Sequence, residues 1–321
     1  MNLKKSVPVF FIFLLFNSIL GFGQTDTVTI EQPSYVFLDY TNDYFNGEDR
    51  YYTQGIQIEV ALPEIAKSPF RKMLIGSKNE TGSSQGLFIK HEAFSPTSIR
   101  SEDILYGDHP FGCAVFAGQN RVSLNDEKNT RISSDFTVGS MGRIGKCKEI
   151  QTGIHKATGN RIPFGWQHQL AADFILNYHV RFEKGLFVKK NIEFQTFADA
   201  RVGSYLNNAR VGIATRVGKI QSYFKPINQH KTSKVHIYMD GEAYVEAVGY
   251  NASMQGGLFS TSVYTIPSSD VTRVIVGASA RVVLAFKRWS LMHYKTWRTS
   301  AFLNASHHGW GYIKIKYFLN K

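Results

Sequence analysis

Apolar and polar side chains alternate along many segments of this chain, and this period of two constrains its fold more than any other feature. In residues 310–319 the isoleucines share one face of the predicted strand, while Lys314 and Lys316 share the other. Residues 54–62 and 190–203 repeat this arrangement, with the charged side chains on one face only. Such alternation is typical of strands that separate an apolar from a wet environment, so the chain is predicted to be all-β.

Further segments with strand composition bring the total to about twelve. They are residues 35–42, 86–93, 111–122, 134–143, 168–182, 208–218, 234–247, 271–286 and 288–297. Several reach the length of about ten residues that a tilted strand needs to cross a bilayer, and bacterial outer-membrane barrels have an even number of strands. The alternative is a soluble sandwich or a lipocalin-like barrel. We predict a twelve-stranded antiparallel outer-membrane β-barrel, with residues 24–321 forming one transmembrane domain.

Residues 1–23 are predicted to be a signal peptide. Lys4 and Lys5 precede an apolar run from Val7 to Leu20, which is shorter than the roughly 20 residues of a membrane-spanning helix. The formal charge is +12, and removal of a segment with two lysines and no acids lowers it to about +10. A basic, exported chain is expected to meet lipid phosphates or polysaccharide and not nucleic acid. The predicted location is the outer membrane of a Gram-negative cell.

The chain contains two cysteines, Cys113 and Cys147. An oxidising periplasm would allow a disulfide between them, and the sequence alone leaves this question open. Two cysteines without paired ligands nearby do not make a zinc site.

A first polar cluster lies between the first two predicted strands, in TNDYFNGEDRYYTQG. Asn42, Asp43, Asp49 and Thr53 supply hard oxygen ligands there, which suit Ca²⁺ better than Zn²⁺. The alternative is an ordinary hairpin loop, because Asn, Asp and Gly are common turn formers.

A second signal is His155, which follows Gln151 by four residues and precedes the segment PFGWQHQL. This spacing places an imidazole in a loop or short helix near the start of a strand. A histidine can accept a proton from water near neutral pH, and a bound cation can polarise a carbonyl. A lone histidine is more often structural, and we expect this of His307 and His308. The chain has no HExxH motif, P-loop or EF-hand loop.

Taken together, NDYF, DRYYTQG, QTGIH and PFGWQHQL resemble the outer-membrane lipid A 3′-O-deacylase family, the LpxR-like proteins. The resemblance covers most of the mature chain and implies a twelve-stranded barrel with its active site at the extracellular rim. It also implies a Ca²⁺ requirement and lipid A, or lipopolysaccharide, as the substrate. The residues implied are His155 as the catalytic base, Asn42, Asp43 and Thr53 as the metal and carbonyl site, and Gln151 and Asp49 in support. A glutamate of the family has no counterpart in the residues 156–161 that follow the histidine.

The function expected from this resemblance is Ca²⁺-dependent hydrolysis of the ester that holds the 3′-linked acyloxyacyl chain of lipid A. His155 would activate water, and a monomer would suffice. The basic residues Lys146, Lys148, Lys156 and Arg161 either contact the substrate's phosphates or form a solvated rim. Two alternatives stay open, namely a non-catalytic barrel (a porin or structural protein) and an outer-membrane phospholipase.

Overall fold

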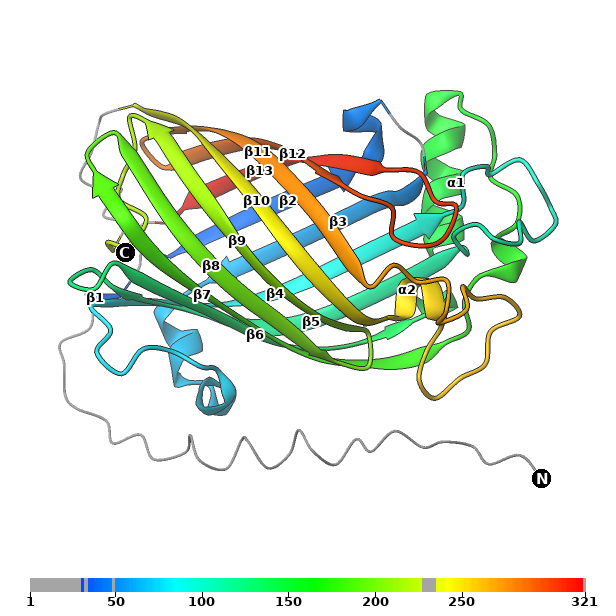
Figure 1. Ribbon diagram of the computed structural model, residues 1–321, viewed down its shortest axis with the longest axis horizontal. Coiled ribbons are helices and arrows are strands. Elements are labelled where there is room, and N and C mark those ends of the chain that lie inside the picture. The colour runs from blue at the N-terminus through cyan, green and yellow to red at the C-terminus, as the bar shows by residue number, and fades with distance from the viewer. Residues whose placement is uncertain (1–29, 32–33, 48–49, 227–234, 320–321) are drawn as a thin grey trace.

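Twelve antiparallel strands close into a barrel in the computed structural model of the chain (Figure 1). The structure describes residues 30–31, 34–47, 50–226 and 235–319, so the predicted signal peptide lies outside the described residues. Consecutive strands are hydrogen-bonded to each other, and the last strand pairs with the first. Backbone groups inside a bilayer have no water to bind, and closure gives every strand a partner on both sides. The predicted fold class is confirmed.

The barrel strands are β2 (Tyr35–Asn42), β3 (Tyr51–Ala61), β4 (Gly82–Ser95), β5 (Gly112–Asn125), β6 (Thr130–Met141), β7 (Asp173–Lys189), β8 (Ile192–Gly203), β9 (Leu206–Gly218), β10 (His236–Asn251), β11 (Val274–Phe286), β12 (Trp289–Arg298) and β13 (His308–Phe318). A short strand, β1 (Ile30–Glu31), pairs in parallel with β4. The helical segments are η2 (Asp43–Asn46), η3 (Pro63–Lys67), η4 (Pro69–Met73), η5 (Arg143–Gly145), α1 (Cys147–Thr158), η6 (Trp166–His168) and α2 (Ala252–Gln255).

The predicted strand segments all correspond to observed strands, with shifts of a few residues at their ends. The largest shifts are in β7, which continues to Lys189 instead of residue 182 and begins at Asp173, not at residue 168. The difference arises because η6 places the buried Trp166 in the rim before the strand starts. None of the helices in the described part of the chain is long and apolar enough to cross a membrane.

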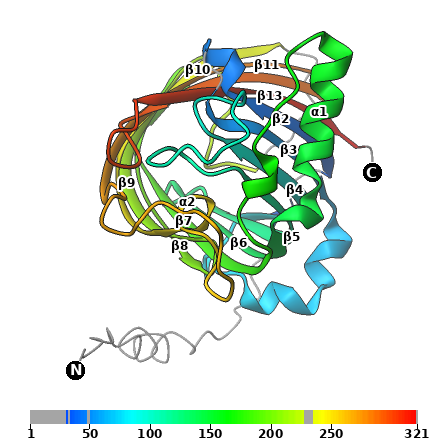
Figure 2. The ribbon, with the colours of Figure 1, turned by 90° about the vertical axis from the view of Figure 1, so that its right-hand side faces the viewer.

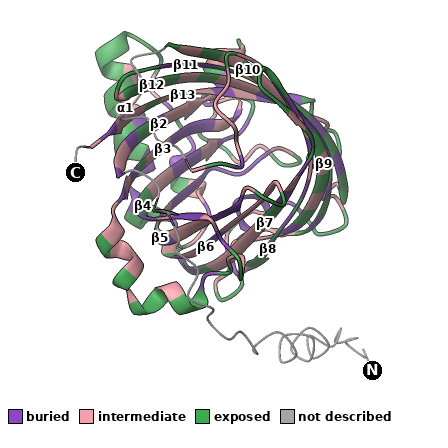
Figure 3. Ribbon diagram, turned by 90° about the vertical axis from the view of Figure 1, so that its left-hand side faces the viewer, coloured by how far each residue is buried: buried purple, intermediate pink, exposed green. Residues whose placement is uncertain are grey.

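Buried and exposed residues alternate along the barrel strands (Figure 3). The exposed outer side chains are mostly apolar, while charged side chains face the interior, as the alternation predicts. Leu38, Ile58 and Ile89 lie directly opposite one another on β2, β3 and β4, and all three are exposed, with Ile89 62% accessible. Lys314 points inward instead, where its Nζ lies 3.3 Å from Asp39 Oδ2. A charge facing lipid at mid-bilayer costs about 2–4 kcal/mol, so the bilayer fixes which face of each strand points out.

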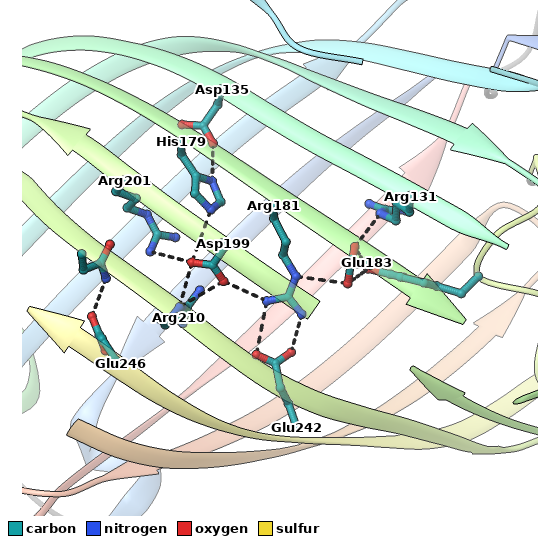
Figure 4. Close-up of polar contacts among 12 residues, drawn as sticks. Arg131, Asp135, His179, Arg181, Glu183, Asp199, Arg201, Arg210, Glu242 and Glu246 are labelled. Carbon is teal, nitrogen blue, oxygen red and sulfur yellow. Dashed lines mark hydrogen bonds and ion pairs between the residues drawn. The ribbon is translucent and has the colours of Figure 1, made fainter. Parts of the chain in front are cut away.

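Charged side chains inside the barrel form a continuous ion-pair network on β6 to β10 (Figure 4). At its centre Asp199 accepts a hydrogen bond from Arg210 Nε at 3.0 Å, and Arg181 NH1 lies 3.5 Å away. Arg181 also donates to Glu242 at 2.9 Å. His179 lies between Asp135 Oδ2 (2.8 Å) and Asp199 Oδ1 (3.8 Å). Charges removed from bulk water need such partners to stay ionised.

The segment after β9 folds into the lumen and narrows one end of the barrel. Tyr223 donates its hydroxyl proton to Glu183 and its backbone N–H to Glu193, each at 3.1 Å. Phe224 beside it is fully buried. Glu193 is also paired with Arg216 at 2.7 Å. The side chains of Tyr223 and Phe224 therefore occupy part of this end of the lumen.

Most helical segments gather at one end of the barrel, which we call the helix rim (Figures 1 and 2). It carries η2, α1, η6 and α2, together with the loops 96–111, 142–172, 252–273 and 299–307. The first barrel strand begins and the last one ends at the opposite rim. Because the longer loops of outer-membrane barrels are extracellular, we assign the helix rim to the outside of the cell.

Aromatic rings pack together at the helix rim around His109, a buried residue of loop 96–111. The His109 ring stacks on Phe94 with the centroids 5.5 Å apart, and it lies 6.1 Å from Tyr51 and 6.2 Å from Phe302. Its Nδ1 is bonded to the Pro110 carbonyl at 2.7 Å. Burial lowers the pKa of His109 to about 4. The loop is therefore held to the barrel by a histidine that is neutral at physiological pH.

The interior network predicts that Asp199→Asn is destabilising. The substitution leaves the cationic groups of Arg181 and Arg210 without one of their carboxylate partners, which we expect to lower the free energy of unfolding by about 3 kcal/mol. Urea unfolding of the protein in detergent micelles measures the change. Glu127→Gln, at an exposed turn residue, is the control and should stay within about 0.5 kcal/mol of the parent. Equal stabilities for all three proteins would contradict the structural role of the network.

The burial of His109 predicts that loop 96–111 opens in acid. The unfolded pKa is about 6.5 and the folded pKa is lower, so the stabilisation is complete above pH ~6.5 and is lost as the pH falls toward 4. The full loss is about 3 kcal/mol. Hydrogen-exchange protection factors of the loop, corrected for intrinsic exchange, should fall over this range. His109→Phe keeps a ring and should flatten the dependence, and an unchanged pH profile would refute the assignment.

Candidate functional site on the outer face of the helix rim

Asn42 is the last residue of β2, and its side-chain amide contacts both η2 and β3. Its Oδ1 accepts the backbone N–H of Tyr44 at 2.7 Å and so caps η2, while its Nδ2 donates to the Thr53 carbonyl at 2.6 Å. The alternation that runs through Leu38 and Tyr40 places Asn42 on the outer face of β2, and Asn42 Nδ2 lies 3.3 Å from the Tyr40 hydroxyl. The amide is therefore held at the lipid-facing side of the rim.

Asp43 and Thr53 lie beside this amide. Asp43 is 1% exposed, and its Oδ2 accepts the backbone N–H of Arg50 at 2.7 Å. Thr53 is not between the two strands, as the sequence suggested, but inside β3 at a bulge between Tyr52 and Gln54. A bulge re-aims one side chain, and here Thr53 Oγ1 meets Ser95 Oγ on β4 at 2.6 Å. Asp49 lies outside the described residues.

The donor set of this cluster fits a hard cation. Asn42 offers an amide oxygen, Asp43 a carboxylate, and Thr53 a hydroxyl, all of which are oxygen ligands of the kind Ca²⁺ prefers. Of these three groups only the Asp43 carboxylate carries a charge, and it is buried. Whether these residues bind calcium stays a prediction.

A second group, His91 with Cys113 and Cys147, also has metal-ligand atoms within 4.8 Å of one another. It is not a thiolate site, because the two cysteines form a disulfide. The disulfide that the sequence left open thus joins the first residue of α1 to β5. His91 Nε2 lies 2.9 Å from the Gly145 carbonyl and 3.2 Å from Cys147 Sγ.

The disulfide fastens α1 to the outside of the barrel. In the register of β4 and β5, Cys113 lies directly opposite Ala93. Ala93 is on the same face of β4 as the lipid-facing Ile89. Figure 2 shows α1 lying along the outside of the wall formed by β2 to β5. The helix therefore stands on the same outer face as Asn42 and at the same rim.

One face of α1 carries Cys147, Gln151 and His155, which are spaced by four residues. Gln151 is buried, and its Oε1 accepts a hydrogen bond from Trp166 Nε1 at 2.7 Å. Trp166 in turn packs on Phe111 with the ring centroids 4.8 Å apart. The sequence placed His155 in a loop or short helix, and the structure places it in the last turn of α1.

His155 is held in a defined orientation by its own loop. Its Nδ1 lies 2.5 Å from the Arg161 carbonyl oxygen, which can only accept a proton. In the neutral imidazole the proton is therefore on Nδ1, and Nε2 keeps the lone pair that a general base needs. A histidine positioned in this way can deprotonate a water molecule.

The structure thus forms two groups from the predicted site residues. In the first group Asn42 contacts Thr53 and is followed directly by Asp43. In the second group Gln151 and His155 share one face of α1. Both groups lie at the helix rim. Ser95, Tyr40 and Trp166 contact these residues and were not among the predicted site residues. The four predicted basic residues are all exposed, as is His307, while His308 is buried against the Tyr51 ring at 5.2 Å.

Comparison with known proteins places the chain in a family. The family described as "Outer membrane protein LpxR" matches residues 9–319. No curated protein matches the chain. The solved structure of LpxR from Salmonella typhimurium superposes with a TM-score of 0.73 at 15% identity, covering 89% of this chain and 100% of that one.

Other solved structures resemble this chain less closely. The β domain of the Bordetella autotransporter Brka has a TM-score of 0.45 at 9% identity, covering 89% of this chain and 98% of its own. The KdgM porin has a TM-score of 0.41 at 6% identity, covering 89% of this chain and 99% of its own. The family match spans nearly the whole sequence, and it agrees with the family that the sequence motifs indicated. The chain belongs to the LpxR family of outer-membrane proteins.

Proposed function

We propose that this protein is a lipid A 3′-O-deacylase that hydrolyses the ester holding the 3′-linked acyloxyacyl chain of lipid A. The observation that carries the proposal is the position of the candidate site, which lies on the outer face of the helix rim and not in the lumen. Lipid in the outer leaflet can reach this face by lateral diffusion. Its ester bonds lie near the polar boundary of the membrane, at the depth where the strands end.

The proposed chemistry is the attack of water on the ester carbonyl. His155 Nε2 takes a proton from the water, the hydroxide oxygen bonds to the carbonyl carbon, and the bond to the sugar oxygen breaks. The proton then passes to that oxygen, so the products are a fatty acid and a free 3′-hydroxyl. General-base catalysis of this type contributes about 10²–10⁴ in rate.

Asn42, Asp43 and Thr53 would hold the cation beside the reacting ester. When bound, Ca²⁺ would polarise the carbonyl and stabilise the negative charge that develops on its oxygen. Gln151 would be a positioning residue, because its hydrogen bond with Trp166 holds the face of α1 that carries His155. Asp49 stays a proposed supporting residue.

The charge of the helix rim also suits a phosphorylated substrate. Lys146, Lys148, Lys156 and Arg161 are exposed on α1 and on the residues that flank it. Lipid A carries phosphate groups, and exposed cations next to the site would attract them. This surface supports lipid A over an uncharged lipid as the substrate.

The test is mass spectrometry of lipid A after incubation with the protein refolded in detergent, with Ca²⁺ or with a chelator. We expect the loss of one acyloxyacyl mass with Ca²⁺, and a rate about 10²–10⁴ lower for His155→Ala. The chelator should reduce the rate as well. His307→Ala, which removes an exposed histidine at the same rim, is the matched control and should keep the parent rate.

The other outcomes separate the alternatives. Unchanged lipid A under every condition would contradict the deacylase proposal and favour a non-catalytic barrel. Release of fatty acid from added phospholipid, with lipid A intact, would instead identify a phospholipase. Activity that survives in His155→Ala would remove this residue from the mechanism.

A further inference from the structure

The outer wall of the barrel has a polar region where only lipid-facing side chains are expected. Gln119 lies directly opposite the exposed Leu87, and Arg121 lies two residues further along the same face of β5. Ser134 shares the outer face of β6 with the exposed Val138. Polar groups of this kind facing hydrocarbon would have no hydrogen-bond partner in the lipid.

One segment of the chain covers this region. Residues 62–80, here called the strap, connect β3 to β4 at the opposite rim and contain η3 and η4. Figures 1 and 2 show their short helices outside the barrel wall. The outward polar side chains bind the strap's backbone, through Gln119 to Ile65 O (3.4 Å), Arg121 to Leu74 O (3.2 Å), Ser134 to Ile75 O (2.8 Å) and Tyr178 to Met73 O (2.9 Å).

Further contacts fix the far end of the strap. The backbone N–H of Ser77 donates to Ser123 Oγ at 2.8 Å, and Arg121 is paired with Glu80 at 2.8 Å. Gly76 lies so close to the guanidinium that a Cβ at this position would be 2.4 Å from Arg121 Cζ. Specific contacts along its length therefore dock the strap on the barrel wall.

The surface that the strap presents in turn is apolar. Phe70 is 52% exposed, Met73 47% and Ile75 40%. This apolar surface continues into the lipid-facing wall, because the Ile75 N–H is bonded to the Tyr178 hydroxyl at 3.0 Å, and Tyr178 shares the outer face of β7 with the exposed Phe182. The strap therefore extends the lipid-contacting surface of the barrel at this rim.

Cations lie next to these apolar side chains. The strap contains Lys67, Arg71, Lys72 and Lys78 against Glu64 and Glu80. Glu80 is paired with Arg121 at 2.8 Å and more loosely with Arg71 at 3.8 Å. A short segment with exposed aromatic and aliphatic groups beside lysine and arginine is typical of elements that lie in the membrane interface. Anionic lipid headgroups attract such cations.

We propose that the strap is an interfacial anchor that binds anionic phospholipid in the periplasmic leaflet. Phe70, Met73 and Ile75 insert among the upper acyl chains, while Lys67, Arg71 and Lys72 contact the headgroup phosphates. The occupant is lipid because the surface is continuous with the lipid-facing wall and carries complementary charge. This inference is independent of the proposed lipid A chemistry, which takes place at the other rim.

The depth of the anchor can be measured by fluorescence of the full-length protein in nanodiscs. Phe70→Trp should add an emission component that lipids with brominated acyl chains quench and aqueous iodide does not. The control is Tyr106→Trp, at an exposed residue of loop 96–111 on the helix rim, which iodide should quench. If iodide quenches the tryptophan at position 70 and brominated lipid does not, the insertion is wrong.

The headgroup preference is a separate measurement on the same nanodiscs. Energy transfer from Phe70→Trp to a headgroup-labelled anionic phospholipid, titrated into neutral lipid, reports binding at the strap. Neutralising Lys67, Arg71 and Lys72 to Gln should weaken binding about tenfold or more. Lys189, Lys190 and Lys287, three exposed lysines of the same rim, form the matched triple control and should change it little.

Two results would overturn the proposal. Equal weakening by both triple variants would mean that the headgroups respond to the general charge of the rim and not to the strap. A dimer by light scattering, with position 70 shielded from both quenchers, would mean that a second copy of the chain covers this surface. The heat-modified mobility of each variant on gels serves as the check that the barrel has folded.

Discussion

Closure of the backbone hydrogen-bond ring is the constraint on which the rest of this structure depends. Inside a bilayer an unpaired strand edge has no water to satisfy it, so the last strand must pair with the first. The twelve strands then form one continuous ladder in which each residue has a fixed neighbour. Because a shift of one residue would turn every side chain to the other face, this ladder also decides what faces lipid and what faces the lumen.

The register of the strands places the ion-pair network and the candidate site on opposite faces of the barrel wall. Asp199 and its arginines face inward, where they satisfy one another. Asn42 ends an outward-facing row of side chains, and the bulge at Thr53 brings its hydroxyl to Ser95. The candidate site therefore lies on the membrane-facing side of the wall, which is the face that the proposed lipid substrate would reach.

The sequence predicts the parts of this fold that depend on local alternation. The strands are predictable because lipid enforces a period of two, and Asn42, Asp43 and Thr53 can be grouped as candidates because one hairpin contains them. The strap was missed for a physical reason. Its residues do not alternate between apolar and polar. The polar Gln119 and Arg121 do not fit a lipid-facing strand face, and only the strap that covers them explains their position.

The relation between His155 and the rest of the site also could not be read from local pattern. About a hundred residues separate His155 from Thr53, and the position of α1 is set by packing of Trp166 and by the disulfide. Two cysteines indicate a bridge only when the strand and the helix that carry them are known to approach each other.

The disulfide shows how the position of α1, the helix that carries His155, depends on the compartment. Cys113 and Cys147 are 34 residues apart in sequence, and closing a loop of that length in the unfolded chain corresponds to roughly 4 kcal/mol of stabilisation. This bond attaches helix α1 to the outer face of the barrel, and α1 is not part of the hydrogen-bonded ladder of strands. An oxidising environment is therefore part of what holds His155 at the rim, so the same export that delivers the barrel to its membrane also completes the proposed site.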